Sequence, residues 1–451
     1  MRRPTDGPGG RAITATVAEG AAARGAAVGL LSGVLDEKRP LDALIDSAGG
    51  LPEFRTLLPR DRALARAIAG VALRRHGQIA DILARLIARR PPPRAGRLMR
   101  IIEVAAAQML FLDVPDHAAV SIAVDQAARD PNARHFKALV NGVLRRLARE
   151  REALLAGQDA VVLNTPGWLF QRWSAHYGAG TARAIAEAHL TEAALDVTVR
   201  REATLWAERL GGTVLPNGSV RFLAKGPIES LPGFADGAWW VQDAAATLPV
   251  RLLGDVSGQS VADLCAAPGG KTMQLAAAGA QVTAVDRSLP RLGRLRQNLV
   301  RLRLEAETVA ADVLGFDGGR RFDAVLLDAP CSATGTIRRH PDVAWLKSAA
   351  DIATLAALQA QLLARAVELA RPGGLIIYST CSLEPEEGED QARRALVALP
   401  VAPAPISPEE LAGLGTISRE GWACTLPSDL PAADRRLAGL SGFFIARFRR
   451  K

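Results

Sequence analysis

The chain has 451 residues, of which 49% are hydrophobic, and this length predicts two or three domains with sizeable cores. Ala, Arg and Gly interrupt the apolar runs and only four cysteines occur, so we expect no membrane span, secretory signal or disulfide framework, and a cytoplasmic location. The net charge of +9 lies entirely in residues 1–150, which carry 24 Lys and Arg against 15 Asp and Glu, whereas the remainder carries 32 of each.

This charge distribution has two interpretations. A basic segment joined to a neutral one attracts polyanions, because phosphates neutralised by Lys and Arg release their counterions. Alternatively, Arg is simply the usual surface residue of this chain, in which only six lysines occur. Charge alone leaves both interpretations open.

The first third of the chain is predicted to be a short disordered leader, residues 1–20, followed by helices over residues 21–150. The prolines of residues 91–93 mark a loop, and Asp61, Asp116 and Asn132 stand where helix N-caps are expected. We therefore predict a compact all-α domain. Apolar residues recur at three- and four-residue spacing in Arg62–Arg75, Ile79–Ala88, Leu98–Leu110 and His117–Ala128.

Residues 151–235 have a different texture. A helix over Trp168–Tyr177 leads to short alternating stretches at Leu195–Arg200 and Val220–Leu223, separated by turn residues. This pattern predicts a linker helix and a small α/β module that ends near Ala235.

Residues 236–451 alternate apolar strands with helical patterns, notably over Leu289–Leu304 and Ala349–Leu369. Such alternation favours a mostly parallel sheet with helices on both faces, a Rossmann-like α/β domain. The expected strands are Ser260–Ala266, Gln281–Asp286, Thr308–Asp312, Phe322–Ala329 and Leu375–Thr380.

The first of these strands leads into a loop of small residues, and such a loop lets a backbone approach a ligand at a helix N-terminus. Its spacing is not that of a phosphate-binding P-loop. Asp286 ends the second strand, where it can accept hydrogen bonds from a ribose, and Asp312 ends the third, where it suits an adenine amino group. These positions indicate an adenosine-type cofactor and leave NAD open. The loop residues are Cys265, Ala266, Ala267, Pro268, Gly269, Gly270 and Lys271.

Two further strands end in cysteines, within Asp328–Ser332 and Tyr378–Ser382. A lone buried cysteine is usually an inert small hydrophobe, but neighbouring strands would bring Cys331 and Cys381 into one crevice beside Asp328. Methylation of carbon 5 of cytosine explains such a pair. One thiolate adds to carbon 6 and a second group assists release, while Asp328 hydrogen-bonds the ring nitrogen. The motif of amino-group methylation, Asn or Asp followed by Pro-Pro and an aromatic residue, is absent from the fourth strand.

The stretches Asp263–Thr272, Asp328–Ser332 and Tyr378–Ser382 resemble the signature motifs of the NOL1/NOP2/Sun family of RNA 5-methylcytosine methyltransferases. The resemblance covers the chain from about Asn164 onward. It implies that the cofactor is S-adenosylmethionine, held by Cys265–Lys271 with Asp286, Asp312 and Asp328. It also implies that Cys381 is the nucleophile and that Cys331 releases the product, with Asp328 and Lys271 completing the catalytic set.

The stretches His117–Val120 and Lys137–Leu147 resemble the helical NusB-like domain, which precedes this catalytic domain in bacterial members that act on 16S ribosomal RNA. Two positions depart from the family pattern. Ala333 stands where many members have Gly, and Ser441 stands where Asp is frequent. Neither is a catalytic position.

We therefore expect three parts: an all-α NusB-like RNA-binding domain (21–150), a small α/β RNA-binding module (151–235) and a Rossmann-like class I S-adenosylmethionine-dependent methyltransferase domain (236–451). The expected reaction is methylation of carbon 5 of a cytosine in 16S ribosomal RNA, free or in a partly assembled small subunit. Transfer RNA as substrate and a non-catalytic antitermination protein are the alternatives. We expect a monomer without metal or membrane partners.

Overall fold

The computed structural model describes residues 9–47, 49–89, 91–317 and 319–451. The chain divides into two compact units, one of residues 1–169 with 340–346 and one of residues 170–339 with 347–451. Of the expected leader, residues 1–8 lie outside the described residues, and the first helix begins at Gly9.

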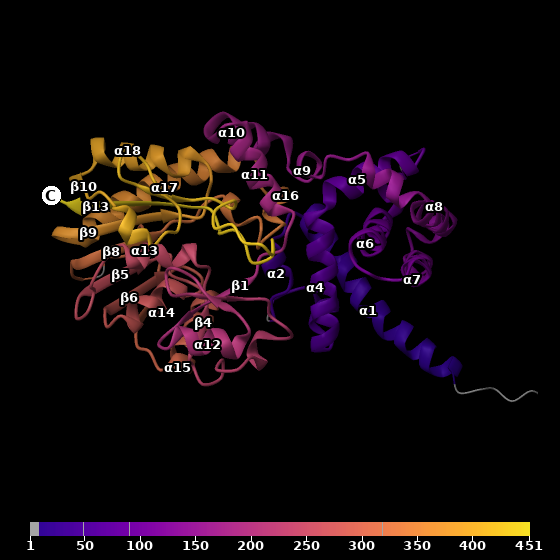
Figure 1. Ribbon diagram of the computed structural model, residues 1–451, viewed down its shortest axis with the longest axis horizontal. Helices are drawn as coiled ribbons and strands as arrows, with labels where there is room; N and C mark the ends of the chain where they lie inside the picture. The colour runs from indigo at the N-terminus through magenta and orange to yellow at the C-terminus, as the bar shows by residue number, and fades with distance from the viewer. Residues whose placement is uncertain (1–8, 48, 90, 318) are drawn as a thin grey trace, which may run out of the picture. The chain divides into compact units, whose positions relative to one another are not determined.

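The first unit is helical, as the apolar spacing predicts (Figure 1). Its helices are α1 (Gly9–Leu35), α2 (Leu41–Leu44), α3 (Pro52–Arg55), α4 (Pro59–Arg74), α5 (His76–Leu86), α6 (Leu98–Phe111), α7 (Asp116–Arg129), α8 (Lys137–Ala156), α9 (Ala160–Leu163) and α16 (Val343–Leu346), with 3-10 turns at Pro93–Ala95 and Arg134–Phe136. Helix α6 is its centre and is buried along most of its length, because α1, α4, α5, α7 and α8 all pack against it.

The N-caps predicted for these helices are wrong. The N-cap of α4 is Leu58 and that of α7 is Pro115, so Asp61 and Asp116 lie inside the first turn instead. Asn132 lies in a turn ahead of α8. A proline fixes φ near the helical value and starts these helices earlier, and an acidic residue in the first turn still favours the positive end of the helix dipole.

The first unit includes a segment, residues 340–346, from the catalytic part of the sequence. The indole Nε1 of Trp345 donates a hydrogen bond to the Leu73 carbonyl at 2.9 Å, and its ring meets that of His76 edge-on at 4.7 Å. The Leu41 N–H donates to Asp342 at 2.9 Å. Burial lowers the pKa of His76 to about 4, so this ring is neutral at physiological pH.

The second unit begins with a small module built on a four-stranded antiparallel sheet of order β2-β3-β1-β4. The sheet continues past residue 235, where we expected the module to end, because Trp239–Val241 pairs with the first strand. The elements are α10 (Gly167–Tyr177, which begins in the first unit), α11 (Ala179–His189), β1 (Leu195–Val199), α12 (Ala203–Leu210), β2 (Thr213–Val214), β3 (Val220–Phe222), a 3-10 turn (Ile228–Ser230) and β4 (Trp239–Val241).

The remainder of this unit is a nine-stranded sheet with helices, and it confirms the predicted Rossmann-like fold. Its strands are β5 (Ser260–Leu264), β6 (Gln281–Asp286), β7 (Glu307–Ala310), β8 (Phe322–Asp328), β9 (Ala370–Thr380), β10 (Val401–Pro403), β11 (Thr416–Ile417), β12 (Ala423–Thr425) and β13 (Phe443–Arg450). Its helices are α13 (Leu248–Arg251), α14 (Gly270–Ala277), α15 (Leu289–Leu302), α17 (Ala349–Leu369) and α18 (Glu389–Ala398), with 3-10 turns at Ala245–Thr247, Thr334–Thr336, Pro385–Glu387 and Pro408–Leu411.

The strand order places a functional edge in this sheet. The order is β11-β12-β13-β9-β8-β5-β6-β7, with β10 paired to β13. The strands from β9 to β7 run parallel, whereas β13 runs antiparallel to β9. Because the chain order reverses at β5, with β6 on one side and β8 on the other, ligands are expected at the carboxyl ends of β5, β6 and β8.

Helix α17 has the length and apolar composition of a membrane span, contrary to our expectation that no run would have them. Its buried residues, among them Leu362, Leu363 and Ala366, belong to the core beneath the sheet, where α17 packs against β8 and β9. The apolar composition is therefore explained by packing within this unit.

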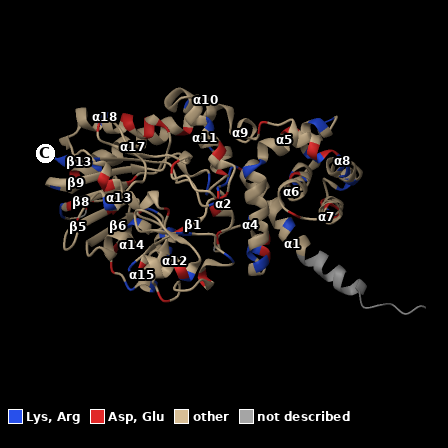
Figure 2. Cartoon of the chain, viewed as in Figure 1, with Lys and Arg blue, Asp and Glu red and all other residues tan. Residues whose placement is uncertain are grey.

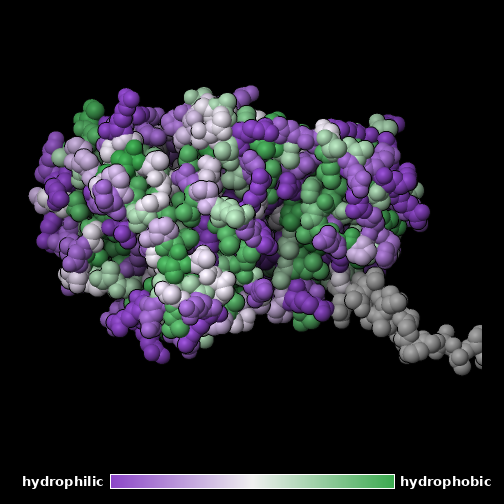
Figure 3. Space-filling model, viewed as in Figure 1, coloured by the Kyte–Doolittle hydropathy of each residue, from purple (hydrophilic) through white to green (hydrophobic). Residues whose placement is uncertain are grey.

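Helix α15 shows how sequence spacing places a helix on the sheet. Leu292, Leu295, Leu299 and Leu302 are buried at three- and four-residue spacing, whereas the intervening positions are mostly exposed. Figure 3 shows hydrophilic side chains gathered over α15.

Candidate active site

The predicted cofactor loop joins β5 to α14. Cys265 turns the chain at a φ of 60°, and Gly269 caps α14 at a φ of 106°. A Cβ on Gly269 would lie 2.6 Å from Cγ of Leu295 in α15, so this glycine is required by helix packing as well as by its conformation. A Cβ on Gly270 would meet only Gln242 at 3.6 Å. The loop therefore owes its tight course to one glycine of the pair.

Asp286, the last residue of β6, ties this loop to the sheet. Its buried carboxylate accepts the Ala267 N–H at 3.0 Å and the Ser288 N–H at 2.8 Å. Each oxygen keeps a second lone pair for a ligand donor. Asp312, in contrast, is exposed and lies two residues beyond the end of β7, where its Oδ1 accepts the Leu314 N–H at 2.9 Å.

A carboxylate that the motif reading left without a role lies under the loop. Asp263 is 0% exposed, and its Oδ2 accepts the Thr272 hydroxyl at 2.5 Å, whereas its Oδ1 has no partner among the described residues. Burial raises the pKa of Asp263 to about 7. Carboxylates at the ends of three neighbouring strands, with a small-residue loop between them, are a suitable donor set for the ribose and ammonium groups of an adenosyl amino acid.

Lys271 turns from the cofactor loop toward the end of β8. Its Nζ lies 2.7 Å from Asp328 Oδ2 and 5.3 Å from the centre of the Phe443 ring. The Ser379 hydroxyl donates to Asp328 Oδ1 at 3.2 Å. This charge pair joins β5, β8 and β9 at their carboxyl ends.

Cys331 and Cys381 meet at the same edge of the sheet, as the strand order predicts. Strands β8 and β9 are paired in parallel with Asp328 opposite Ser379, and the two Sγ atoms that follow lie 3.5 Å apart. The contact with Cys381 and burial together raise the pKa of Cys331 well above its ordinary value. Burial raises the pKa of both Cys265 and Cys424 to about 12, so these two thiols stay protonated.

Sequence reasoning missed Glu387, which lies behind the two cysteines. This carboxylate is 0% exposed and bonds Ser332 and Ser382, the residues that follow Cys331 and Cys381. The sequence offers little to distinguish it from its neighbours, because Glu384, Glu386 and Glu389 stand close by.

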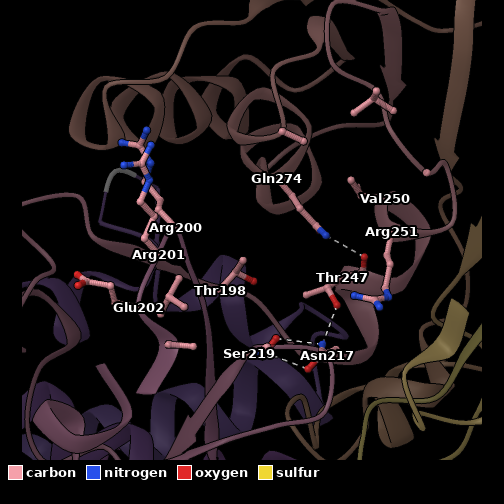
Figure 4. A pocket seen from close by; sticks show the side chains of 16 residues that line it. Thr198, Arg200, Arg201, Glu202, Asn217, Ser219, Thr247, Val250, Arg251 and Gln274 are labelled. Atoms are coloured by element: carbon pink, nitrogen blue, oxygen red, sulfur yellow. Dashed lines mark hydrogen bonds between the residues drawn. The ribbon is translucent and has the colours of Figure 1, made fainter. Parts of the chain in front are cut away.

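A second hollow, of about 420 Å³, lies between the small module and α14, apart from the cysteines. Asn217 donates to the hydroxyls of Ser219 and Thr247, at 3.1 and 2.9 Å, and Gln274 donates to the Thr247 carbonyl at 3.0 Å (Figure 4). The polar groups of this wall are thus engaged with one another.

The sequence matches two families of known proteins. Residues 21–149 match the NusB family, and residues 250–449 match the family described as 16S rRNA methyltransferase RsmB/F. The ribosomal RNA small subunit methyltransferase B of Cronobacter sakazakii is 35% identical over 410 residues, which are 87% of this chain and 91% of that protein. The chain belongs to the RsmB/F family. The corresponding protein of Serratia proteamaculans is 37% identical over 79% of this chain and 86% of its own length.

Solved structures agree with the RsmB/F assignment. A methyltransferase homolog from Pyrococcus horikoshii is 28% identical with a TM-score of 0.53, covering 67% of this chain and 98% of its own. NSun6 from the same organism is 19% identical with a TM-score of 0.54, over 63% of this chain and 98% of its own, and shares the fold. As an RsmB/F member, this chain is an S-adenosylmethionine-dependent ribosomal RNA methyltransferase with a NusB-like domain ahead of its Rossmann-like domain.

The two departures from the family pattern have local explanations. Ala333 has a φ of 61°, a left-handed conformation that glycine adopts more readily. The Ser441 hydroxyl donates to Asp243 Oδ2 at 2.7 Å, where an aspartate would place two carboxylates together. Among the described residues, no group of three His, Cys, Asp or Glu side chains is arranged to hold a metal ion.

Proposed function

We propose that this RsmB/F member methylates carbon 5 of one cytosine in 16S ribosomal RNA, through a covalent bond between Cys381 and carbon 6 of that base. The observation that carries the proposal is the 3.5 Å separation of the Cys331 and Cys381 Sγ atoms, at the ends of neighbouring parallel strands. Methylation of a base amino group requires no thiol, whereas methylation of carbon 5 requires one group to add and another to assist release.

The chemistry assigns the Cys381 thiolate to carbon 6 of the base. Its addition turns the ring into an enamine, whose carbon 5 attacks an electrophilic methyl group. S-adenosylmethionine, when bound, supplies that methyl group. The carbon 5 proton then leaves to a base, the bond between Cys381 and carbon 6 breaks, and the thiolate is regenerated.

The contact between the two sulfurs supports an order of events for Cys331. While Cys381 is a thiolate, its charge and contact keep the pKa of Cys331 high, so that Cys331 stays protonated beside it. Once Cys381 is bonded to carbon 6 its charge is gone, and with it a main cause of the raised pKa. Cys331 is then able to accept the carbon 5 proton and so assist release.

Asp328 and Lys271 are assigned to the base. As the thiolate adds to carbon 6, negative charge develops at the ring nitrogen beside the exocyclic amine. The pair they form at 2.7 Å, with Asp328 partly exposed at the strand end, offers a hydrogen-bonding group and a compensating cation at that point.

We assign the cofactor to the loop Cys265–Lys271, with Asp286 facing the ribose, Asp312 the adenine and Asp328 the reacting end. The bonds from Asp286 to Ala267 and Ser288 support this assignment, because they hold the loop against the strand end. We expect the protein to act in the cytoplasm as a monomer, on 16S ribosomal RNA that is free or in a partly assembled subunit. The names of its relatives favour ribosomal over transfer RNA.

Bisulfite sequencing of ribosomal and transfer RNA, from cells with and without the gene, tests this function. We expect one cytosine of 16S ribosomal RNA to lose its protection in the deletion strain. The wild-type gene should restore it, and a gene carrying Cys381→Ala should not. Unchanged protection of every 16S cytosine in the deletion strain would contradict the proposal.

A further inference from the structure

A single buried carboxylate lies between the two cysteine-bearing segments. Glu387 Oε1 accepts the Ser332 N–H at 2.9 Å, and its Oε2 accepts the hydroxyl of Ser332 and, at 2.6 Å, that of Ser382. The two hydroxyls are also 3.0 Å from each other. Ser332 directly follows Cys331 and Ser382 directly follows Cys381, so the backbone positions of both cysteines depend on one side chain.

The surroundings of Glu387 are built to hold it in one place. The Gln359 amide of α17 donates to its Oε1 at 2.9 Å, and the Tyr378 hydroxyl of β9 donates to its main-chain carbonyl at 2.6 Å. Its donors are neutral groups, so the charge is compensated by several hydrogen bonds instead of by a cation. A buried carboxylate of this kind is costly unless all its bonds are made, which strongly favours one arrangement of the two segments.

We propose that Glu387 is a positioning residue, which sets the separation of the Cys331 and Cys381 sulfurs by bonding Ser332 and Ser382 at once. The inference rests on the proposed function, because the separation matters only where both thiols act on one base. Glu387 acts through the two serines and touches neither sulfur. A displacement of about 1 Å at a reacting atom can lower a rate by two orders of magnitude.

The substitution Glu387→Gln keeps the size of the side chain but turns one acceptor into a donor that faces donors. We expect kcat to fall on the order of 10- to 100-fold. The affinity for S-adenosylmethionine should not change, because the bonds of Glu387 reach no residue of the cofactor loop. Glu386→Gln is the matched control, since Glu386 is half-exposed in the same turn and pairs with Arg172. A purely structural role would lower the melting temperature and leave kcat of the folded enzyme unchanged.

Oxidative cross-linking of the full-length protein gives a readout besides activity. Diamide takes two electrons and two protons from the two thiols, which become a disulfide, and is reduced to the hydrazine. Mass spectrometry after alkylation then measures the rate of the Cys331–Cys381 bond, with Cys265 and Cys424 as internal references. We expect wild type and Glu386→Gln to cross-link at one rate and Glu387→Gln to cross-link severalfold more slowly. Equal rates and equal kcat in the two variants would overturn the proposal.

Two further arms keep these outcomes distinct. If Glu387→Gln does not fold, the double substitution Ser332→Ala with Ser382→Ala replaces it and should give the same losses in kcat and cross-linking. If Glu387→Gln folds, adding Ser382→Ala should cost little more than the single change, because both remove the same bond. A wild-type enzyme that leaves carbon 5 unmethylated contradicts the proposed function, whereas the cross-linking comparison still decides the role of Glu387.

Discussion

Lys271 Nζ lies 2.7 Å from Asp328 Oδ2, so the loop after β5 and the last residue of β8 share one charge pair. The ammonium is nearly buried, with its side chain 9% exposed, whereas the carboxylate is 34% exposed and faces the site. The pair therefore connects the proposed cofactor loop with the proposed base pocket, and it keeps a cation where negative charge would develop on the ring.

Replacing Lys271 by Met tests this pair. The stem is kept and the cation is lost, so kcat should fall on the order of 100-fold, as for the loss of one preorganised group that stabilises developing charge. Steady-state kinetics on an RNA substrate measures it. Lys225→Met, at an exposed lysine of the small module, should behave as wild type. Equal kcat in the two variants would contradict a role for the pair.

Asp286→Ala should weaken S-adenosylmethionine binding by about 1.5–3 kcal/mol, because a charge-assisted acceptor for the ribose is lost. The change also frees the Ala267 N–H, so the loop itself is loosened. Isothermal titration of the full-length protein measures the effect. Asp312→Ala should cost less, since that carboxylate is exposed and holds only its own turn. An unchanged affinity for Asp286→Ala would refute its assignment.

Ala333→Gly should stabilise the second unit by about 0.5–1 kcal/mol, because a φ of 61° strains a residue with a Cβ. Ala353→Gly, on the exposed face of α17, should have the opposite sign and destabilise by about 1 kcal/mol. Scanning calorimetry gives the direction of both shifts in melting temperature. A lower melting temperature for Ala333→Gly would mean that the left-handed turn is not strained.

Helix α8 carries exposed basic residues (Figure 2), and the charge excess of residues 1–150 is proposed to contact RNA. Replacing Lys137, Arg145 and Arg149 by Glu should flatten the plot of log affinity against log salt by about 2, at roughly 0.7 per lost phosphate contact on single strands. Filter binding at several salt concentrations measures the slope. A slope equal to that of wild type would show that this helix makes no contact with phosphates.

The fold and the edge that holds the site are predictable from the sequence, because both follow from local patterns. Apolar spacing gives Ala349–Leu369 with both ends correct, and strand alternation brings Cys331 and Cys381 together. Element ends are less predictable. Strand β7 stops at Ala310, so Asp312 belongs to the following turn, and prolines displace the expected N-caps.

Long-range contacts lie beyond such patterns. Nothing local distinguishes Glu387 from the neighbouring glutamates, since its role arises from donors more than 25 residues away, on Ser332 and Gln359. Likewise, only the fold shows that Trp345 packs against His76 and Leu73 of the helical unit.

The central claim, that Cys381 attacks and Cys331 releases, is tested most directly on a denaturing gel with RNA and S-adenosylmethionine. Cys331→Ala should methylate once and then stall with RNA bonded to Cys381, because the carbon 5 proton is lost only after methyl transfer. It should therefore give a slow-migrating protein–RNA band, whereas Cys381→Ala and the double variant should give none. A band from Cys381→Ala and none from Cys331→Ala would contradict the account and exchange the two roles.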